Sequence, residues 1–467
     1  MARNKNYPRY ENIEVIDIAD KGKAIARINE QVIIIDHAVP GDIVDVQVIR
    51  KRKKYLEAKL IYIHKLSEHR ETPFCEHFDL CGGCKWQDMK YSRQLYHKQQ
   101  QVENQLKRIG HLNLPSISDI LPSQEKEFYR NKLEYTFSNY RWIENSEPKI
   151  ERNEKELYAL GFHIPGRFDK VLNIKNCYLQ DTPSNDIRNF VRDKSLELNL
   201  SYYDIKKHTG YLRNLTIRTA QTGEVMVLLS IAGELNNDCK KLLDSLNQNY
   251  NITSLMYVIN TKLNDSINDL NPVLYSGQDF IIENLNGLKF KIGPKSFFQT
   301  NTKQAEKLYR IVKDFVLPNS DDIIYDLYTG TGTIANYLAL ESKKVVGIEY
   351  IPEAISDAIY NAELNEITNT MFFAGDIKDV LNEEFVDKHC KPQTIVLDPP
   401  RAGIHEDVAK QILKISPQKI VYVSCNAATQ ARDLTILSSK YSITKVQPVD
   451  MFPHTQHVEN VVKLELK

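Results

Sequence analysis

The feature that most constrains the fold is a series of short apolar runs near the C-terminus, each ending in a polar or glycine-rich turn. The first run, 323–327, leads into Thr329-Gly330-Thr331-Gly332-Thr333, and the next, 345–348, ends at Glu349. Such continuous apolar runs are typical of buried parallel strands, and the segments between them have a helical pattern. The sequence therefore predicts an α/β domain whose chemistry lies at the carboxyl edge of a parallel sheet.

Three later runs place reactive side chains at the same predicted edge. They are 371–373 before Gly375-Asp376, 394–397 before Asp398-Pro399-Pro400, and 420–423 before Ser424-Cys425-Asn426. A carboxylate and a thiol at neighbouring strand ends could face one pocket. Cys425 is a candidate nucleophile, and the alternative interpretation is a buried, small apolar residue.

The glycine-rich turn predicts a nucleoside-binding site. Gly330 and Gly332 let the backbone approach a ligand, and an acid at the second strand end, Glu349, binds ribose hydroxyls in such folds. Gly330-x-Gly332-x-x-Ala335 also fits a dinucleotide fingerprint, so an NAD-linked oxidoreductase is one alternative. With Asp376 and Asp398-Pro399-Pro400 added, the succession resembles a Rossmann-like class I methyltransferase that uses S-adenosylmethionine (SAM).

The N-terminal part predicts a small β-barrel. Residues 10–66 are rich in Ile and Val, and Pro40-Gly41-Asp42 is a turn signal. The whole chain is neutral, with 61 basic and 61 acidic side chains, but residues 1–70 hold 14 Lys and Arg against 10 Asp and Glu. The run 50–54 is entirely basic, which on an OB-type barrel favours RNA binding over a merely solvated loop. The segment resembles a TRAM domain.

Three of the seven cysteines are clustered as C-x5-C-x2-C: Cys75, Cys81 and Cys84. This spacing predicts a metal centre, and Cys177 is the most plausible fourth donor. A compact triplet with one remote cysteine suits a [4Fe-4S] cluster better than zinc, although both remain open. Four cysteine ligands predict a cluster that is structural or positions RNA.

Between the barrel and the α/β domain the pattern is mixed. Residues 85–109 have a helical pattern, and Tyr129-Arg130-Asn131-Lys132 combines groups that stack on bases and bind phosphates. We predict three domains: a TRAM-like barrel over 1–67, an α+β central domain over 68–290 that carries the cluster and an RNA-binding surface, and a methyltransferase domain over 291–467. Residues 85–124 would form a helical connection that packs toward the catalytic domain.

The residues also indicate the atom that is methylated. Amino-methylating enzymes of this fold carry an aromatic residue after Asn/Asp-Pro-Pro, where this chain has Arg401. Cys425 permits different chemistry: a thiolate adds to C6 of uracil, C5 takes the methyl group, and a base then removes the C5 proton. Glu459 is the candidate base, and the alternative is a surface carboxylate on a strand.

Four blocks resemble the signatures of the RNA uracil-5-methyltransferase family. They are Lys295-Ser-Phe-Phe-Gln299, Asp398-Pro-Pro-Arg-Ala-Gly403, Ser424-Cys-Asn426 with Arg432-Asp433, and His457-Val-Glu459. The resemblance implies that Cys425 is the nucleophile and Glu459 the base. It also implies a SAM and target-base pocket lined by Gln299, Tyr328, Gly330, Glu349, Asp376 and Asp398. Thr333 and Ala427 depart from the family pattern, which leaves a cofactor contact by Thr333 less secure.

With the barrel and the cysteines, the likeness is closest to the branch that acts on 23S ribosomal RNA. The alternatives are a tRNA substrate and an RNA-binding scaffold without activity. The chain has no apolar segment long enough to span a bilayer, and Met1-Ala2-Arg3-Asn4-Lys5 lacks the apolar core of a signal peptide. We expect a cytoplasmic enzyme without an obligate protein partner.

Overall fold

The computed structural model describes residues 7–144, 147–148 and 150–467, so Met1-Ala2-Arg3-Asn4-Lys5 lies outside the described residues. The chain divides into two compact units: Met1–Gln101 with Phe452–His457, and Val102–Met451 with Val458–Lys467. Within the described ranges, no helix has the length and apolar character needed to cross a membrane.

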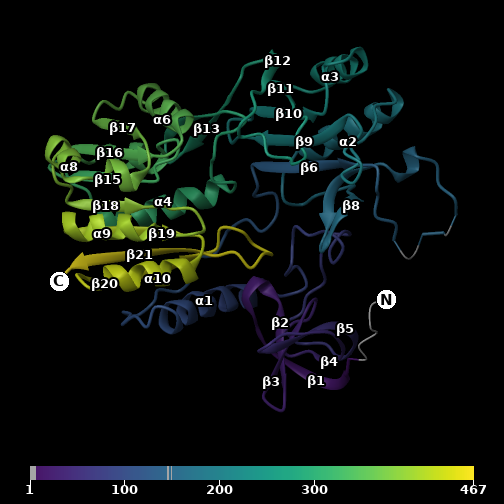
Figure 1. Cartoon of the computed structure of the whole chain (residues 1–467), viewed down its shortest axis with the longest axis horizontal. Helices are drawn as coiled ribbons and strands as arrows, with labels where there is room; N and C mark the ends of the chain where they lie inside the picture. The colour runs from purple at the N-terminus through teal and green to yellow at the C-terminus, as the bar shows by residue number, and fades with distance from the viewer. Residues whose placement is uncertain (1–6, 145–146, 149) are drawn as a thin grey trace. The chain divides into compact units, whose positions relative to one another are not determined.

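The first unit contains the predicted barrel. Its strands are β1 (Arg9–Ile18), β2 (Ala24–Ile28), β3 (Gln31–Ile35), β4 (Ile43–Lys51) and β5 (Tyr55–Lys65), with a short 3-10 helix, η1 (Asp20–Gly22). They close in the order β1-β2-β3-β5-β4 (Figure 1). Alternate residues such as Ile33, Val44 and Val46 are fully buried, so one face of each strand forms the core. The five-stranded closed barrel confirms the predicted N-terminal fold.

The residues of two connections in the barrel explain their conformation. Gly41 has φ +96°, and Asp42 accepts hydrogen bonds from Val39 N at 2.7 Å and Ser67 N at 2.9 Å, which closes the predicted turn. The basic run forms the β4–β5 connection. There Arg52 pairs with Glu57 at 2.7 Å and Arg50 lies 3.8 Å from the same carboxylate.

Helix α1 (Tyr91–Arg108) is shorter than the predicted 85–109. It begins late because residues 85–90 form turns, in which Lys90 N donates to His69 O at 2.8 Å and Met89 N donates to Trp86 O at 3.1 Å. After the helix, the chain is extended instead of helical. Ser118 N donates to Val446 O at 3.1 Å and Leu121 N to Pro448 O at 2.9 Å, so this segment runs beside the strand that contains Val446.

The second unit begins with a mixed seven-stranded sheet in the order β12-β11-β10-β9-β6-β7-β8. Its strands are β6 (Lys132–Ser138), β7 (Ala159–Ile164), β8 (Arg167–Asn173), β9 (Leu212–Thr219), β10 (Val225–Ile231), β11 (Ser254–Ile259) and β12 (Val273–Gly277). Its helices are η2 (Lys155–Leu157), α2 (Ser184–Glu197) and α3 (Asn237–Asn249). β9 and β10 form the predicted antiparallel hairpin, with Val225 opposite Thr219. A two-stranded hairpin, β13 (Ile281–Leu285) and β14 (Leu288–Ile292), follows.

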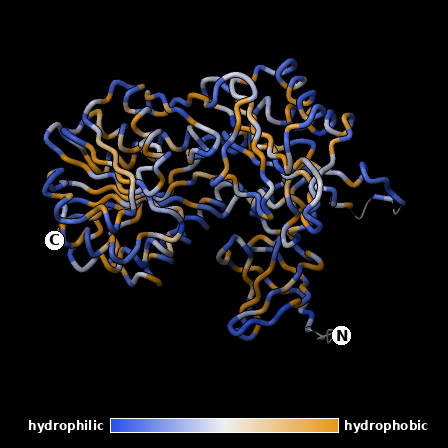
Figure 2. The backbone as a smooth tube through the Cα atoms, turned by 45° about the horizontal axis from the view of Figure 1, so that its top comes forward, coloured by the Kyte–Doolittle hydropathy of each residue, from blue (hydrophilic) through white to orange (hydrophobic). Residues whose placement is uncertain are grey.

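The C-terminal sheet has the order β17-β16-β15-β18-β19-β21-β20. Its strands are β15 (Ile323–Leu327), β16 (Lys344–Glu349), β17 (Thr370–Ala374), β18 (Thr394–Leu397), β19 (Lys419–Ser424), β20 (Tyr441–Val449) and β21 (Glu459–Leu466). Its helices are α4 (Thr302–Val316), α5 (Thr333–Ala339), α6 (Pro352–Leu364), α7 (Ile377–Val380), α8 (Glu383–His389), α9 (Glu406–Ile415) and α10 (Ala427–Leu437). Figure 2 shows the hydrophobic backbone segments gathered in these strands.

The register of this sheet fixes where the predicted site residues meet. β15 to β19 are parallel, and Leu327 pairs with Leu397, so Tyr328 and Asp398 leave the sheet at one edge. β21 runs antiparallel to β19, which places its first residue at that same edge. The doubly wound α/β domain predicted from the apolar runs is therefore confirmed.

Candidate active site

Cys425 and Glu459 are brought together by the pairing of β19 with β21. Ser424 pairs with Asn460, so the next residues along that register are Cys425 and Glu459. Glu459 is only 5% exposed, whereas Cys425 is half-buried and remains reachable. The two residues are 34 positions apart in the sequence, and only this antiparallel strand brings them into one site.

Buried amides hold this pair in place. Gln430 Nε2 donates to Tyr422 O at 2.9 Å and to Asn460 O at 3.2 Å, and its Oε1 accepts from Asn460 Nδ2 at 2.7 Å. Asn426 caps α10 by accepting from Ala428 N at 3.1 Å. The thiol thus lies immediately before a helix N-terminus that is tied to both strands.

The acidic groups of the site raise one another's pKa. Burial, followed by the charge of Glu459, raises the pKa of Cys425 to about 11. Burial and the charge of Asp398 raise the pKa of Glu459 to about 8. Burial and the charge of Asp326 raise the pKa of Asp398 to about 7. At neutral pH the thiol is therefore protonated, and the carboxyl groups titrate in the range where a general base works.

Arg401 opposes the rise in the pKa values of Cys425 and Glu459. It was not predicted as a site residue. Its charge lowers the pKa of both Cys425 and Glu459, although burial outweighs it. The Arg401 carbonyl accepts from Asn426 Nδ2 and from Thr429 Oγ1, each at 3.1 Å, so its loop is fastened to α10. Its position three residues after the strand-end Asp398 was the available sequence signal.

The pair Arg432-Asp433 has a structural explanation. Asp433 is 1% exposed, and its Oδ2 accepts from Ile404 N at 2.9 Å and Tyr422 Oη at 2.7 Å. Arg432 donates to Ala402 O at 2.9 Å. These bonds hold the loop 399–404 against α10 and thereby set the position of Arg401.

We expect Gly403→Ala to disrupt this loop. Gly403 has φ +79°, and a Cβ there would lie 2.3 Å from Asp433 Oδ2 and 2.7 Å from the guanidinium Nη2 of Arg432. The substitution should destabilise the unit by about 2 kcal/mol or more and lower the thermal unfolding midpoint. The matched control is Gly223→Ala, with φ +85° and no atom within 4 Å of the added Cβ. Equal losses in the two variants would show that the contacts with Asp433 and Arg432 are unimportant.

The glycine-rich turn lies open beside a carboxylate. Gly330 has φ +55°, and a Cβ at this position would meet no atom within 4 Å, so the turn faces free space. Glu349 Oε2 accepts from Gly330 N at 3.2 Å and its Oε1 from Ile351 N at 3.1 Å. Asp326 Oδ1 is buried and has no partner among the described residues. Burial raises the pKa of Asp326 to about 7.

These groups suit a positively charged nucleoside. Tyr328 has φ +67°, and burial, with the nearby charges of Asp433, Asp376 and Glu349, raises its pKa to about 12. An edge this rich in carboxylates would repel the pyrophosphate of a dinucleotide, whereas a sulfonium or ammonium group would stabilise the ionised carboxylates. The residues present therefore fit SAM better than NAD.

Gln299, predicted from the resemblance to line the pocket, lies on a separate segment before α4. Its carbonyl accepts from Asn131 Nδ2 at 2.9 Å, and Asn131 N donates to Thr300 O at 2.8 Å. Asn301 caps α4 and donates to Met451 O at 2.9 Å. Half-buried Gln299 is thus fixed through its backbone, which leaves its side chain available for a ligand.

The predicted metal ligands fall on two parts of the chain. Cys75, Cys81 and Cys84 lie in a loop of the first unit, where Gly83 N donates to Cys81 Sγ at 3.4 Å. Cys177 lies in the second unit between β8 and α2. Over the described ranges, no group of three or more His, Cys, Asp or Glu side chains is arranged to hold a metal ion. The structure therefore gives the predicted cluster no support, and no step below passes through it.

Comparison with known proteins agrees with this geometry. Residues 215–467 match the family model described as tRNA (Uracil-5-)-methyltransferase, and residues 9–61 match that of the TRAM domain. A Bacteroides thetaiotaomicron protein described as an uncharacterized RNA methyltransferase is 53% identical over 454 residues, which cover 96% of this chain and 100% of that protein. One from Porphyromonas gingivalis, described in the same words, is 47% identical, with coverages of 97% and 99%.

A solved structure is similar over the same extent. The Pyrococcus abyssi tRNA (uracil-54, C5)-methyltransferase, in complex with S-adenosyl-L-homocysteine, has a TM-score of 0.76 and 28% identity. The match covers 97% of this chain and 99% of that one. The fold and the strand-end site define a class I SAM-dependent methyltransferase. The chain belongs to the RNA uracil-5-methyltransferase family, and its substrate is RNA.

Proposed function

We propose that this enzyme methylates C5 of a uridine in 23S ribosomal RNA through a covalent bond between Cys425 Sγ and uracil C6. The observation that carries the proposal is the pairing of β19 with β21, which brings a reachable thiol beside a buried carboxylate. Removal of a proton from a ring carbon requires a base with a raised pKa, and burial gives Glu459 a pKa of about 8.

The first step belongs to Cys425. The thiol proton passes to solvent, the Cys425 thiolate bonds to C6, and the electrons of the C5–C6 double bond move into an enolate, which makes C5 nucleophilic. Arg401 and the N-terminus of α10 both favour the thiolate, against the burial and the carboxylates that disfavour it. SAM, when bound, supplies the electrophilic methyl group that C5 takes.

The second step belongs to Glu459. C5 now carries both the methyl group and its original hydrogen, and the Glu459 carboxylate removes that hydrogen as a proton. The electron pair restores the C5–C6 double bond, and the Cys425 thiolate leaves C6. Uracil therefore gains a methyl group and loses a proton, and the thiolate is regenerated.

We expect methylation to accelerate with rising pH between 6.5 and 8.5. Because the pKa of Glu459 is raised to about 8, this group is mostly protonated at pH 6.5 and cannot accept the C5 proton. The value of kcat, which includes proton removal after methyl transfer, should rise roughly tenfold or more across this range at saturating RNA and SAM. Initial rates in buffers of constant ionic strength measure it. A flat or falling profile would contradict the assignment of Glu459 as the base.

Two substrates are supported by different observations. The resemblance of the barrel and the cysteine triplet to the 23S branch favours ribosomal RNA. The Pyrococcus abyssi protein is described as a tRNA methyltransferase and is similar across nearly the whole chain, which favours tRNA. The barrel alone therefore does not distinguish the two substrates.

The deciding experiment offers the enzyme unmodified 23S ribosomal RNA and unmodified tRNA with methyl-labelled SAM. Nuclease digestion and mass spectrometry then locate the label. Label in 5-methyluridine of 23S RNA is the expected result. Label confined to tRNA would overturn the substrate, and label on another atom of uridine would overturn the reaction.

The [4Fe-4S] cluster on Cys75, Cys81, Cys84 and Cys177 remains a prediction. Anaerobically purified protein should contain about four irons per chain and absorb visible light. Cys81→Ser should lose both properties, while the matched control Cys239→Ser, a buried cysteine of α3, should keep them. A colourless protein that contains zinc, or no metal, would contradict the prediction.

A further inference from the structure

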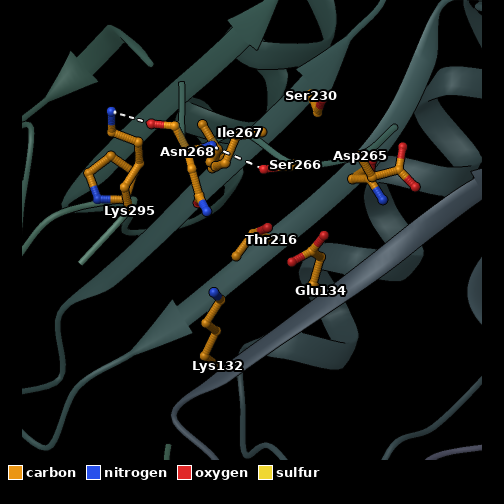
Figure 3. Close-up of a pocket in the computed structure, with 12 residues that line it drawn as sticks. Lys132, Glu134, Thr216, Ser230, Asp265, Ser266, Ile267, Asn268 and Lys295 are labelled. Atoms are coloured by element: carbon orange, nitrogen blue, oxygen red, sulfur yellow. Dashed lines mark hydrogen bonds between the residues drawn. The ribbon is translucent and has the colours of Figure 1, made fainter. Parts of the chain in front are cut away.

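A cavity of about 310 Å³ lies on one face of the sheet that contains β9 and β10, and its lining includes none of Cys425, Glu459 and Asp398. Figure 3 shows the side chains of Lys132, Glu134 and Thr216 directed into the same space. The residues that line it are Lys132, Glu134, Asn214, Thr216, Leu228, Ser230, Asp265, Ser266, Ile267, Asn268, Pro294 and Lys295. Its volume is in the range of small-ligand sites.

The face of the sheet beneath this cavity is both polar and buried. On β9, Leu215 and Ile217 point to the apolar side, while Asn214 and Thr216 point to the cavity side at only 6% and 8% exposure. On β10, Ser230 is 4% exposed. A solvated sheet face would be exposed, and an ordinary core face would be apolar. This face combines buried polar groups with apolar Leu228 and Ile267, a mixture typical of binding sites.

Two of these buried polar groups lack a partner. Asn214 Oδ1 and Ser230 Oγ make no hydrogen bond with any other residue that the structure describes. The two residues are direct cross-strand neighbours, since Asn214 pairs with Ser230 in the β9–β10 register. A buried polar atom without a partner is destabilising, so a ligand that supplies hydrogen bonds here would be bound favourably.

Lys132, which lines the cavity, lies beside Arg218, a buried cation that does not line it. Lys132 lies opposite Arg218 in the β6–β9 register. Burial, followed by the charge of Arg218, lowers the pKa of Lys132, and burial lowers the pKa of Arg218 to about 10. The Arg218 guanidinium donates to Ser296 O at 2.6 Å, a backbone group without net charge. A phosphate would relieve the repulsion between these two cations.

The wall of the cavity is held in place before a ligand arrives. Lys295 Nζ donates to Asn268 O at 3.2 Å and to Leu270 O at 3.1 Å. Buried Arg213 holds the other end of the same loop, with bonds to Asn260 O at 2.8 Å and Asp265 Oδ1 at 2.8 Å. Preorganisation of this kind reduces the entropy that binding must overcome.

The same wall is close to Gln299, which is predicted to line the pocket for the target base. Pro294 and Lys295 line the cavity, and Gln299 follows four residues later. Asn131, the neighbour of Lys132, donates to the Gln299 carbonyl at 2.9 Å. A strand of RNA that places its target base beside Gln299 would therefore lie near this cavity.

We propose that the cavity binds a second nucleotide of the RNA substrate, close in sequence to the target uridine. The inference rests on the proposed function, since it assumes an RNA strand in the active site. Lys132 binds the phosphate, and Glu134 accepts from the ribose 2′-hydroxyl, a contact that DNA lacks. Asn214 and Ser230 bind the base edge, where the unpartnered Asn214 oxygen accepts from an N–H group of the base.

The test uses the full chain and an RNA fragment of its mapped substrate, with each nucleotide that flanks the target replaced in turn by one that lacks a base. For the unaltered enzyme, one replacement should raise KM about tenfold. For Asn214→Ala, KM for the parent RNA should be raised by the same factor. Replacement of that nucleotide should then raise the KM of this variant no further. Lys132→Gln should weaken binding of every RNA similarly and reduce its salt dependence.

The matched control is Ser254→Ala, which removes a buried serine hydroxyl without a described partner from β11, outside the cavity. Thermal unfolding verifies that each variant folds. If Asn214→Ala does not fold, the KM values of Ser230→Ala and Lys132→Gln test the cavity in its place. KM values and base tolerance equal to those of Ser254→Ala would overturn the proposal. An unaltered enzyme that methylates no RNA would instead overturn the proposed function, and RNA dissociation constants of the same variants would still test the cavity.

Discussion

Cys425→Ala is expected to abolish methyl transfer while SAM still binds. Without the thiolate, C5 of uracil has no route to a nucleophilic form, so the rate should fall by about four orders of magnitude or more. SAM binding should persist because Gly330 and Glu349, which would hold the cofactor, belong to other strand ends. Calorimetry measures the binding, and transfer of label from SAM to RNA measures the rate.

A matched cysteine separates this effect from general damage to the protein. Cys390 lies in the same domain, is exposed, and has no place in the proposed chemistry. Cys390→Ala should therefore retain the full rate. Methylation by Cys425→Ala at a rate close to that of Cys390→Ala would show that the reaction does not pass through the thiol.

Glu459→Gln is expected to stop the reaction after the methyl group has been transferred. The amide cannot accept the C5 proton, so Cys425 stays bonded to C6 and a covalent complex of protein and RNA accumulates. Turnover should fall by about three orders of magnitude or more, while the first methyl transfer persists. Denaturing gel electrophoresis after incubation with RNA and SAM measures the adduct.

A second glutamate on the same strand provides the comparison. Glu465 lies on β21, pairs with Lys463 at 2.7 Å, and is half-exposed. Glu465→Gln should turn over normally without accumulating adduct. If Glu459→Gln formed no adduct and also lost the first methyl transfer, Glu459 would act before proton removal, and the order of steps proposed here would be wrong.

The C-terminal domain was predictable because its signals are local. The apolar runs 323–327, 394–397 and 420–423 needed only continuous burial to be recognised as parallel strands, and the structure has β15, β18 and β19 there. The rule that chemistry lies at the carboxyl edge then placed Asp398 and Cys425 together. The turn at Pro40-Gly41-Asp42 was equally local.

Other features depend on long-range pairing that no local pattern encodes. Glu459 could be linked to Cys425 only by family resemblance, because the antiparallel insertion of β21 is a property of the whole sheet. The influence of Arg401 depends on distances across that edge. The polar cavity beneath Asn214 and Ser230 was missed because β9 and β10 were recognised only as a hairpin, without regard to which face each residue occupies.

The most direct test of the central claim is trapping with RNA that contains 5-fluorouridine. Fluorine at C5 cannot be removed as a proton, so an enzyme that uses Cys425 and Glu459 as proposed should stall as a covalent complex after methyl transfer. Digestion and mass spectrometry should find C6 of the methylated fluorouracil attached to Cys425. The absence of any adduct while SAM is bound, or attachment through another residue, would contradict the proposed mechanism.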